Sequence, residues 1–196
     1  MTEGRPSTAV VLLAGGRSRR YPEGDKALAD VDGEPMCRRA VEGLPGDELV
    51  VSCRAEQRDA LASALEGLAP RFAVDPVPGR GPLAGLLTAF RVAAADRAVV
   101  VGCDMPLFDG STADSLLQSL PAADAAVVDA DGPPSPLGAA YRVGAARRAC
   151  ETTLACGSRR LADALARLDV ARVDADARAV TNCNTPEDVA AALEAL

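Results

Sequence analysis

TAVVLLAGGRSRR, residues 8–20, is the stretch that decides the fold. An apolar run of β-branched residues and leucines ends on Gly15 and Gly16, and arginines follow at once. The run predicts a short buried strand, and the glycines predict a flexible loop that begins where the strand ends. A loop of this kind after a buried strand is a usual place for a ligand in α/β proteins.

Similar apolar runs recur along the chain and predict six further strands, at 47–53, 71–75, 97–106, 125–130, 137–143 and 170–176. Helices are expected between them, from near Pro35, over 54–68, 82–95 and 111–120, twice between the last two strands, and from Thr185. Strand-helix units in succession predict a parallel sheet with right-handed crossovers. We therefore expect an α/β fold with a mostly parallel central sheet.

The composition fits one domain built from small side chains. A chain of 196 residues is long enough for one sizeable core, so we expect a single domain over 1–196. Aromatic residues make up 3%, and Ala, Val and Leu carry the 48% apolar content, which suits parallel strands covered by helices. The net charge of -7 argues against a general nucleic-acid binder, because such proteins neutralise many phosphates.

The cysteines and the apolar segments bear on the cellular compartment. The six cysteines include no C-x-x-C pair and the chain has no histidine, so zinc-finger and Cys/His sites are excluded. We expect free thiols in a reducing cytoplasm rather than disulfides. No apolar run approaches the roughly 20 residues of a membrane span, and the first residues resemble no secretory signal. The sequence thus predicts a soluble cytoplasmic protein.

The loop that follows the first strand does not match two familiar phosphate-binding loops. A Walker A loop needs Gly-Lys and then Ser or Thr, whereas Asp precedes Lys26 and Ala follows it. A dinucleotide fingerprint needs G-x-G-x-x-G, whereas Gly15 and Gly16 are adjacent and arginines follow. Hydrolysis by a Ser-His-Asp or Cys-His site is excluded because the chain has no histidine.

Lys26 is the only lysine among 21 cationic residues, and it follows this loop closely. Nucleotidyl transfer can proceed by positioning and charge neutralisation, because an attacking phosphate is already ionised and needs no base. It requires cationic side chains, backbone N–H groups and a metal held by a carboxylate. The loop region supplies the first two, and Asp104, at the end of the strand 97–106, supplies the carboxylate. The alternative is an exposed basic turn whose glycines only reverse the chain.

The pattern L-A-G-G-x-S-x-R followed by D-K-A-L, over residues 13–28, resembles the signature loop of the molybdenum cofactor guanylyltransferases, the MobA-like family. Three further motifs occur in the family's order: GPLAG at 81–85, CDMP at 103–106 and NCNTPEDV at 182–189. The resemblance implies the Rossmann-like three-layer nucleotidyltransferase fold. It also implies transfer of GMP from GTP to Mo-molybdopterin, with release of pyrophosphate.

The resemblance also assigns roles within the loop. It places these residues at the nucleotide: Leu13, Ala14 and Gly15 beside the guanine, and Gly16, Ser18 and Arg20 at the phosphates. Arg20 and Lys26 would neutralise the triphosphate and the charge that develops during transfer. The plainer alternative for Lys26 is a surface lysine at a helix start, and Asp25 beside it would either orient the loop or be solvated.

Four residues outside the loop complete the implied site. Asp104 would hold Mg²⁺, which prefers carboxylate and phosphate oxygens. Asp75 would contact the guanine edge, and Asn182 and Asn184 would lie on the pterin or metal side of the cleft. Each has a plainer alternative: a turn or cap residue for Asp104, an Asx turn before proline for Asp75, and a helix start with Thr185 as its cap for the last motif.

Three departures from the family pattern concern the loop, the base and the pterin. Tyr21-Pro22 stands where relatives usually have Gly, which removes an N–H donor near a phosphate. Ser52 stands where relatives have an Asn that reaches the nucleotide, and a serine side chain is shorter and lacks the paired groups of an amide. The stretch DGPPSP, 131–136, replaces a His-Pro or Gln-Pro pair on the pterin side.

The motifs leave related functions open. A cytidylyltransferase for the same pterin, or a guanylyltransferase for phospholactate or cobinamide phosphate, would share the fold and the loop. A non-catalytic nucleotide-binding module is a hypothesis of another class, and the presence of Arg20, Lys26 and Asp104 argues against it. Proteins that deliver molybdopterin are the expected protein partners.

Overall fold

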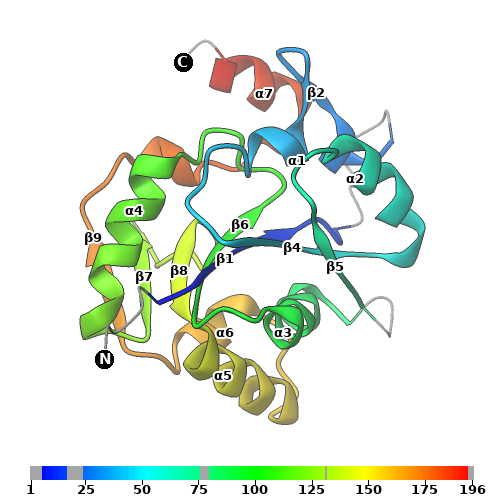
Figure 1. Cartoon of the computed structure of the whole chain (residues 1–196). Helices are drawn as coiled ribbons and strands as arrows, with labels where there is room; N and C mark the ends of the chain where they lie inside the picture. The colour runs from blue at the N-terminus through cyan, green and yellow to red at the C-terminus, as the bar shows by residue number, and fades with distance from the viewer. Residues whose placement is uncertain (1–5, 17–23, 76–79, 131, 194–196) are drawn as a thin grey trace.

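A computed structural model of the chain describes residues 6–16, 24–75, 80–130 and 132–193. Its centre is a seven-stranded sheet of order β5-β4-β1-β6-β8-β7-β9 (Figure 1). The strands are β1 Thr8–Leu13, β4 Glu48–Cys53, β5 Arg71–Val74, β6 Arg97–Gly102, β7 Ala125–Val128, β8 Ala139–Arg142 and β9 Val170–Val173. Among the strands of this sheet that the structure describes, β8 alone runs antiparallel to both of its neighbours. The predicted mostly parallel sheet is confirmed.

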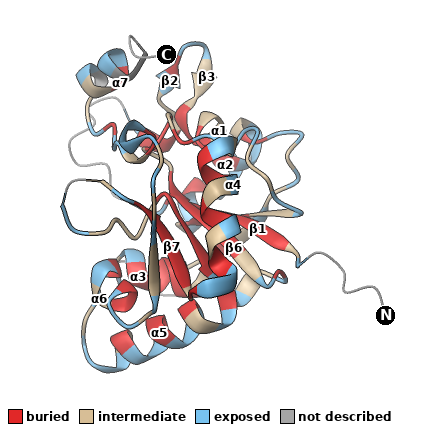
Figure 2. Ribbon diagram, turned by 90° about the vertical axis from the view of Figure 1, so that its left-hand side faces the viewer, coloured by how far each residue is buried: buried red, intermediate tan, exposed pale blue. Residues whose placement is uncertain are grey.

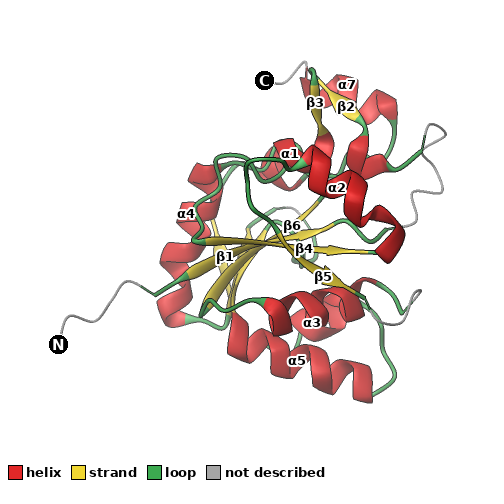
Figure 3. Ribbon diagram, turned by 45° about the vertical axis from the view of Figure 1, so that its right-hand side comes forward, coloured by secondary structure: helices red, strands yellow, loops and turns green. Residues whose placement is uncertain are grey.

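Helices cover both faces of the sheet, which gives three layers (Figures 2 and 3). Side chains of β1 alternate between the faces, so Val10 and Leu12 enter one core cluster while Ala9 and Val11 enter the other. All four are at most 5% exposed, as expected for a central parallel strand. The helices are α1 Met36–Arg39, α2 Arg58–Ala64 and α4 Gly110–Ser119 on the first face, and α3 Pro82–Val92, α5 Val143–Ala155 and α6 Leu161–Leu165 on the second.

A small hairpin precedes α1, where the sequence predicted only a loop. β2 (Asp30–Val31) and β3 (Glu34–Pro35) pair antiparallel. Asp32 and Gly33 make the turn between them with positive φ angles of 58° and 82°, the conformation that Asp-Gly pairs adopt in tight hairpins. The expected helix start near Pro35 is confirmed, because α1 follows the hairpin directly.

A third, smaller cluster joins this hairpin to the last helix, α7 (Pro186–Leu193). Val31 and Met36 pack with Cys183 and Val189, and all four are at most 6% exposed. In Figure 1, α7 accordingly lies beside β2 at one end of the molecule. The cluster therefore holds the segment before α7 close to the hairpin and to the start of α1.

The predicted helix 54–68 is shorter in the structure. A 3₁₀ turn, η2 (Ala55–Gln57), leads into α2, and Gly67 reverses the chain afterwards with a φ of 88°. This positive φ explains why glycine ends the helical segment. In the described parts of the chain, no helix is both long and apolar enough to cross a membrane.

Candidate active site

The carboxyl ends of β1 and β6 form a switch point in the sheet. The chain passes from β1 to β4 on one side and returns to β6 on the other. In open α/β sheets, ligands bind at the carboxyl edge where the strand order reverses in this way. Gly15 follows β1 and Asp104 follows β6, so both residues lie at this edge. Two of the sequence motifs therefore meet where such a fold binds its ligand.

Lys26 joins three distant segments at the same edge. Its Nζ lies 2.8 Å from Asp104 Oδ2 and donates to Asn184 Oδ1 over 2.9 Å. The lysine is only 8% exposed, so its charge is partly desolvated and depends on the carboxylate for compensation. The plainer interpretation of Lys26 as a surface lysine is therefore wrong.

Hydrogen bonds of neighbouring backbone groups position Lys26, Asp104 and Asn184. Lys26 opens the 3₁₀ turn η1 (Lys26–Leu28), and Asp25 caps this turn by accepting from the N–H of Ala27 over 3.1 Å. The carbonyl of Asp104 accepts from the N–H of Cys183 over 2.8 Å. The segment that carries Asn184 is thus attached directly to the edge of β6.

The loop after β1 is anchored where it leaves the sheet. The N–H of Ala14 donates to the carbonyl of Ser52 over 2.8 Å, and the carbonyl of Leu13 accepts from the N–H of Cys103 over 3.1 Å. Gly15, next in the chain, is exposed, and so is the residue after it. The chain therefore passes from a fully paired strand end to an exposed glycine pair.

Arg54 and Gln57, which the sequence analysis did not single out, hold the start of this loop. Arg54 Nη1 donates to the carbonyl of Gly15 over 3.1 Å and also to the carbonyl of Gly16. Gln57 Nε2 donates to the carbonyl of Ala14 over 3.0 Å. The signal that could have revealed them is their position, because polar residues that directly follow β4 lie at the same carboxyl edge as those that follow β1 and β6.

The other predicted site residues lie at different depths. Ser52 is 3% exposed, and its Oγ lies where a side chain on Gly85 of α3 would stand, so its hydroxyl faces the core. The residue supports the loop through its carbonyl. Asp75 follows β5 at the carboxyl edge and is partly buried, and Asn182 is exposed in the segment before α7. Ser18 and Arg20 lie outside the described residues.

A comparison with protein families decides the relationship. A family model described as the MobA-like NTP transferase domain matches residues 10–182. The chain belongs to this family. The match includes the glycine loop after β1, Lys26 and Asp104. The family resemblance proposed from the four motifs is confirmed.

Individual relatives of this MobA-like chain cover nearly its whole length. A probable molybdenum cofactor guanylyltransferase of Natronomonas pharaonis is 39% identical over 195 residues, 95% of this chain and 96% of that protein. A molybdenum cofactor guanylyltransferase of Pseudomonas putida is 36% identical over 198 residues, 95% and 98% of the two chains.

A solved structure of the molybdopterin-guanine dinucleotide biosynthesis protein A from Archaeoglobus fulgidus matches with a TM-score of 0.76 at 25% identity, over 95% of this chain and 97% of that one. A nucleotidyl transfer enzyme from Methanothermobacter thermautotroptrophicus matches with a TM-score of 0.80 at 17% identity, over 96% and 97% of the chains, and supports the fold alone. The predicted nucleotidyltransferase fold is confirmed.

The last motif of this MobA-like chain serves both a helix cap and the site. Asp188 Oδ2 accepts from the N–H groups of Asn184 and Thr185 over 2.7 Å and 2.9 Å, and Thr185 Oγ1 accepts from the N–H of Asp188 over 3.2 Å. The backbone N–H of Asn184 lowers the pKa of Asp188 below its usual value. The interpretation of Thr185 as the cap of a helix start is confirmed, and the side chain of Asn184 remains directed to Lys26.

The donors at this edge fit a hard cation that takes most of its ligands from a substrate. In the described ranges, no three His, Cys, Asp or Glu side chains gather as a metal-binding group. Mg²⁺ is commonly held by one or two carboxylates together with phosphate oxygens and water. Asp104, with 23% of its side chain exposed, offers such a carboxylate. A Cβ on Gly102 would collide with Asp104 Oδ1, so glycine makes room for the carboxyl group.

The cysteines near the site are protonated thiols at neutral pH. All six cysteines lie within the described residues and are free. Burial raises the pKa of Cys37 and of Cys53 to about 11. Burial, together with the neighbouring charge of Asp104, raises the pKa of Cys103 well above its usual value. None of these three thiols is therefore activated as a nucleophile.

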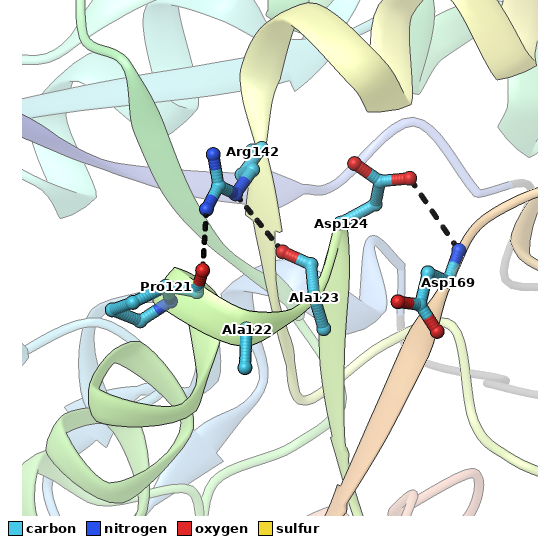
Figure 4. Close-up of a pocket in the computed structure, with 6 residues that line it drawn as sticks. All are labelled: Pro121, Ala122, Ala123, Asp124, Arg142 and Asp169. Atoms are coloured by element: carbon cyan, nitrogen blue, oxygen red, sulfur yellow. Dashed lines mark hydrogen bonds between the residues drawn. The ribbon is translucent and has the colours of Figure 1, made fainter.

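A surface hollow at the opposite edge of the sheet has a structural explanation (Figure 4). Arg142, which lines the hollow, donates to the carbonyls of Leu120, Pro121 and Ala123 at 2.9–3.0 Å. These bonds give the carbonyl groups of the segment after α4 a hydrogen-bond partner. The N–H of Asp169 donates across the hollow to Asp124 Oδ2 over 3.4 Å. The polar groups that line this hollow therefore bond to backbone groups where helices and strands end or begin. The candidate site stays at the carboxyl edge of the sheet.

Proposed function

We propose that the chain is a molybdenum cofactor guanylyltransferase that transfers GMP from GTP to Mo-molybdopterin and releases pyrophosphate. The observation that carries the proposal is the meeting of Lys26, Asp104 and Asn184, residues of three separate motifs, at the switch point of the sheet. Relatives that are 36% and 39% identical over nearly the whole chain bear this name.

The glycine loop would receive the triphosphate. Gly15 and Gly16 are exposed residues, and their backbone N–H groups are suited to bind phosphate oxygens, as successive amides do in other anion sites. The backbone of Leu13 and Ala14 would lie beside the guanine. Arg20, outside the described residues, would add a positive charge to the phosphates.

Lys26 would act on the transferring phosphorus. A phosphate oxygen of the acceptor forms the new bond to the α-phosphorus, while the bond to the departing pyrophosphate breaks. Negative charge grows on the phosphate oxygens in this step, and the ammonium of Lys26 is held by Asp104 and Asn184 where it can stabilise that charge. No general base is needed, because the acceptor phosphate is already ionised.

Asp104 would hold Mg²⁺ together with the phosphates of GTP. When bound, the ion supplies further charge neutralisation and orientation for the triphosphate. Asp75, at the end of β5, would accept from the guanine edge, while Asn182 and Asn184 would face the pterin side. Proteins that deliver molybdopterin would be the partners of this reaction.

The experiment that tests the proposal is thermal unfolding with Mg²⁺ and each of GTP, CTP, ATP and UTP. A ligand stabilises the folded state by RT ln(1 + [L]/Kd), which is about 2.7 kcal/mol at 100 times Kd. We expect a rise in melting temperature with GTP alone, followed by pyrophosphate release when Mo-molybdopterin is added. A rise confined to CTP would transfer the proposal to the cytidylyl reaction, and no rise with any nucleotide would overturn it.

A further inference from the structure

Asp25, Arg54 and Gln57 form a closed polar network beside the glycine loop. Arg54 Nη2 lies 3.5 Å from Asp25 Oδ2, and Gln57 Nε2 donates to the same carboxylate oxygen. Gln57 Oε1 accepts from the N–H of Arg54 over 3.0 Å. Gln57 is 4% exposed, and both ends of its amide are paired, so the side chain is held in one orientation.

In the part of the loop that the structure describes, this network binds carbonyl groups. Arg54 and Gln57 donate to the carbonyls of Ala14, Gly15 and Gly16. The described chain contains no cis peptide bond, and in a trans peptide the C=O and the following N–H point in opposite directions. The N–H groups of Gly15 and Gly16 are therefore turned away from Arg54 and Gln57.

Two successive N–H groups that face the same side make a concave site for an anion. The network therefore does more than stabilise the loop. It fixes the direction in which the backbone N–H groups of the loop point. It achieves this with side chains that lie behind the loop, so they can act without contact with the ligand.

Asp25 extends the same network to Lys26. One carboxylate oxygen of Asp25 contacts Arg54 and Gln57, and the other caps the turn that Lys26 opens. The loop donors and the lysine are consequently fixed to one common carboxylate. A shift of either element would strain its contact with Asp25.

Arginine is suited to position 54 for a geometric reason. Its Nη1 serves two carbonyls, its Nη2 faces Asp25 and its Nε donates to Glu56 over 2.8 Å. A planar guanidinium offers five donors in a fixed fork, whereas a lysine ammonium offers three donors at one point. Lysine would keep the charge at this position but lose the simultaneous contacts.

We propose that Arg54, Gln57 and Asp25 are positioning residues that align the loop amides and Lys26 to receive the triphosphate of the nucleotide. The inference rests on the proposed function for the identity of the nucleotide. It adds to that function three residues that act through the loop.

Affinity for GTP and for guanosine, measured by calorimetry with Mg²⁺ present, tests the inference. In Arg54→Ala, we expect GTP to bind about 10–100-fold more weakly, because the lost contacts are charge-assisted hydrogen bonds, and guanosine affinity to stay within about twofold. Arg54→Lys should recover only part of the loss. Asp25→Asn keeps the oxygen that caps the turn. We expect it to weaken GTP binding less than Arg54→Ala does and to leave guanosine affinity unchanged.

Arg91→Ala is the matched control. Arg91 pairs with Glu151 over 2.9 Å on the exposed surface of α3 and α5, on the other face of the sheet. We expect this variant to bind both ligands as the unaltered chain does. Thermal unfolding of each variant without ligand establishes that the proteins compared are folded.

The outcomes separate this inference from the proposed function. If the unaltered chain binds no GTP, the proposed function fails and the inference fails with it. If the unaltered chain binds GTP and the Arg54 and Asp25 variants bind it equally well, only the inference is overturned. An equal loss of GTP and guanosine, or full recovery with Arg54→Lys, would also overturn it, because these results indicate a general collapse or a role of charge alone.

Discussion

Lys26 is 8% exposed, so its positive charge must be compensated by neighbouring protein groups rather than by water. Asp104 and Asn184 provide this compensation. The same two contacts limit the positions that the ammonium can adopt. A cation held in this way needs little reorganisation when negative charge develops beside it, which is the condition under which electrostatic stabilisation is strongest. The burial of Lys26 is thus part of its proposed chemical role.

Substitution of Lys26 tests this role directly. We expect Lys26→Ala to lower the rate of GMP transfer by about 10²–10³-fold, the loss typical of a preorganised electrostatic group. Lys26→Arg keeps the charge but requires space for a planar guanidinium, so we expect most of the activity to remain lost. Steady-state kinetics of pyrophosphate release measures both effects, with Arg172→Ala as control, because Arg172 is an exposed residue of the edge strand β9. Activity retained in Lys26→Ala would contradict the assignment.

Asp104→Asn separates charge from size at the carboxyl edge. The amide has nearly the same shape but is a poor ligand for Mg²⁺, which prefers carboxylates. We expect Mg²⁺ to raise the GTP affinity of the unaltered chain and to leave that of Asp104→Asn almost unchanged. Calorimetry with and without Mg²⁺ gives the comparison. An equal effect of Mg²⁺ on both proteins would place the metal on other groups.

Thiol reactivity follows from burial. The pKa of Cys37 and Cys53 is raised to about 11 and that of Cys150 to about 12, and burial also raises the pKa of Cys103 and Cys183. Cys156, in contrast, is exposed. Only the thiolate reacts with a disulfide reagent. We expect one fast-reacting thiol per native chain, counted by absorbance with a chromogenic disulfide at pH 8. Cys156→Ser should remove the fast phase, and a fast phase that persists would contradict the assignment.

At the scale of secondary structure, α4 illustrates how a single side chain begins a helix. Asp109 Oδ1 accepts from the N–H of Thr112 over 2.7 Å, and this backbone contact lowers the pKa of Asp109. Asp109→Ala should cost about 1 kcal/mol of unfolding free energy at pH 7, as is typical of an N-cap. Asp114→Ala, an exposed aspartate inside the same helix, is the control and should cost less. Urea denaturation measures both.

The pH dependence of that cap has a definite sign. The folded-state pKa of Asp109 is lowered, so its stabilising contribution is present above the unfolded-state pKa and is lost as the pH falls through the folded-state value. The stability difference between the unaltered chain and Asp109→Ala should therefore shrink in acid. A difference that stayed constant down to the acid transition would show that the carboxylate charge has no part in the cap.

The elements that the sequence predicted well are those whose signal is local. The apolar runs of β1 and β6 mark buried strands without reference to the rest of the chain. The direction of β8 is different, because a buried apolar run looks the same in a parallel and an antiparallel strand. The hairpin β2–β3 was not predicted because two-residue strands carry almost no periodicity, although its Asp32-Gly33 turn is a recognisable signal.

The whole molecule connects the candidate site to packing far from the sheet. Met36 is fully buried in the cluster that joins the hairpin to α7, and Asn184 lies just before that helix. Met36→Ala should cost about 2–5 kcal/mol of unfolding free energy, as other buried Met substitutions do. Because the cluster also holds the segment of Asn184 in place, we expect the rate of GMP transfer to fall as well, measured at a temperature where the variant is folded.

A substitution of similar cost elsewhere provides the comparison. Leu165, 3% exposed on α6, belongs to the cluster on the other face of the sheet. Leu165→Ala should lose comparable stability but retain the transfer rate of the unaltered chain. Equal losses of activity in both variants would show that stability alone, rather than the seating of Asn184, governs the rate.

Site residues could be predicted where the local sequence makes them distinctive, and were missed where it does not. Lys26 and Asp104 stand out because one is the only lysine and the other ends an apolar strand. Arg54 and Gln57 carry no such mark, since they read as the polar start of an amphipathic helix. Their role depends on where β4 lies relative to β1, and that neighbourhood is set by the order of strands in the sheet.

The bond between Lys26 and Asn184 spans 158 positions of the chain, and the bond to Asp104 spans 78. During synthesis on a ribosome, Lys26 emerges early, before Asp104 and Asn184 have been synthesised. A nascent chain can form β1, β4 and β6 while its ammonium still lacks the amide oxygen of Asn184. The arrangement that holds Lys26 is therefore among the last to be completed, and messages that end before codon 184 would yield polypeptides without it.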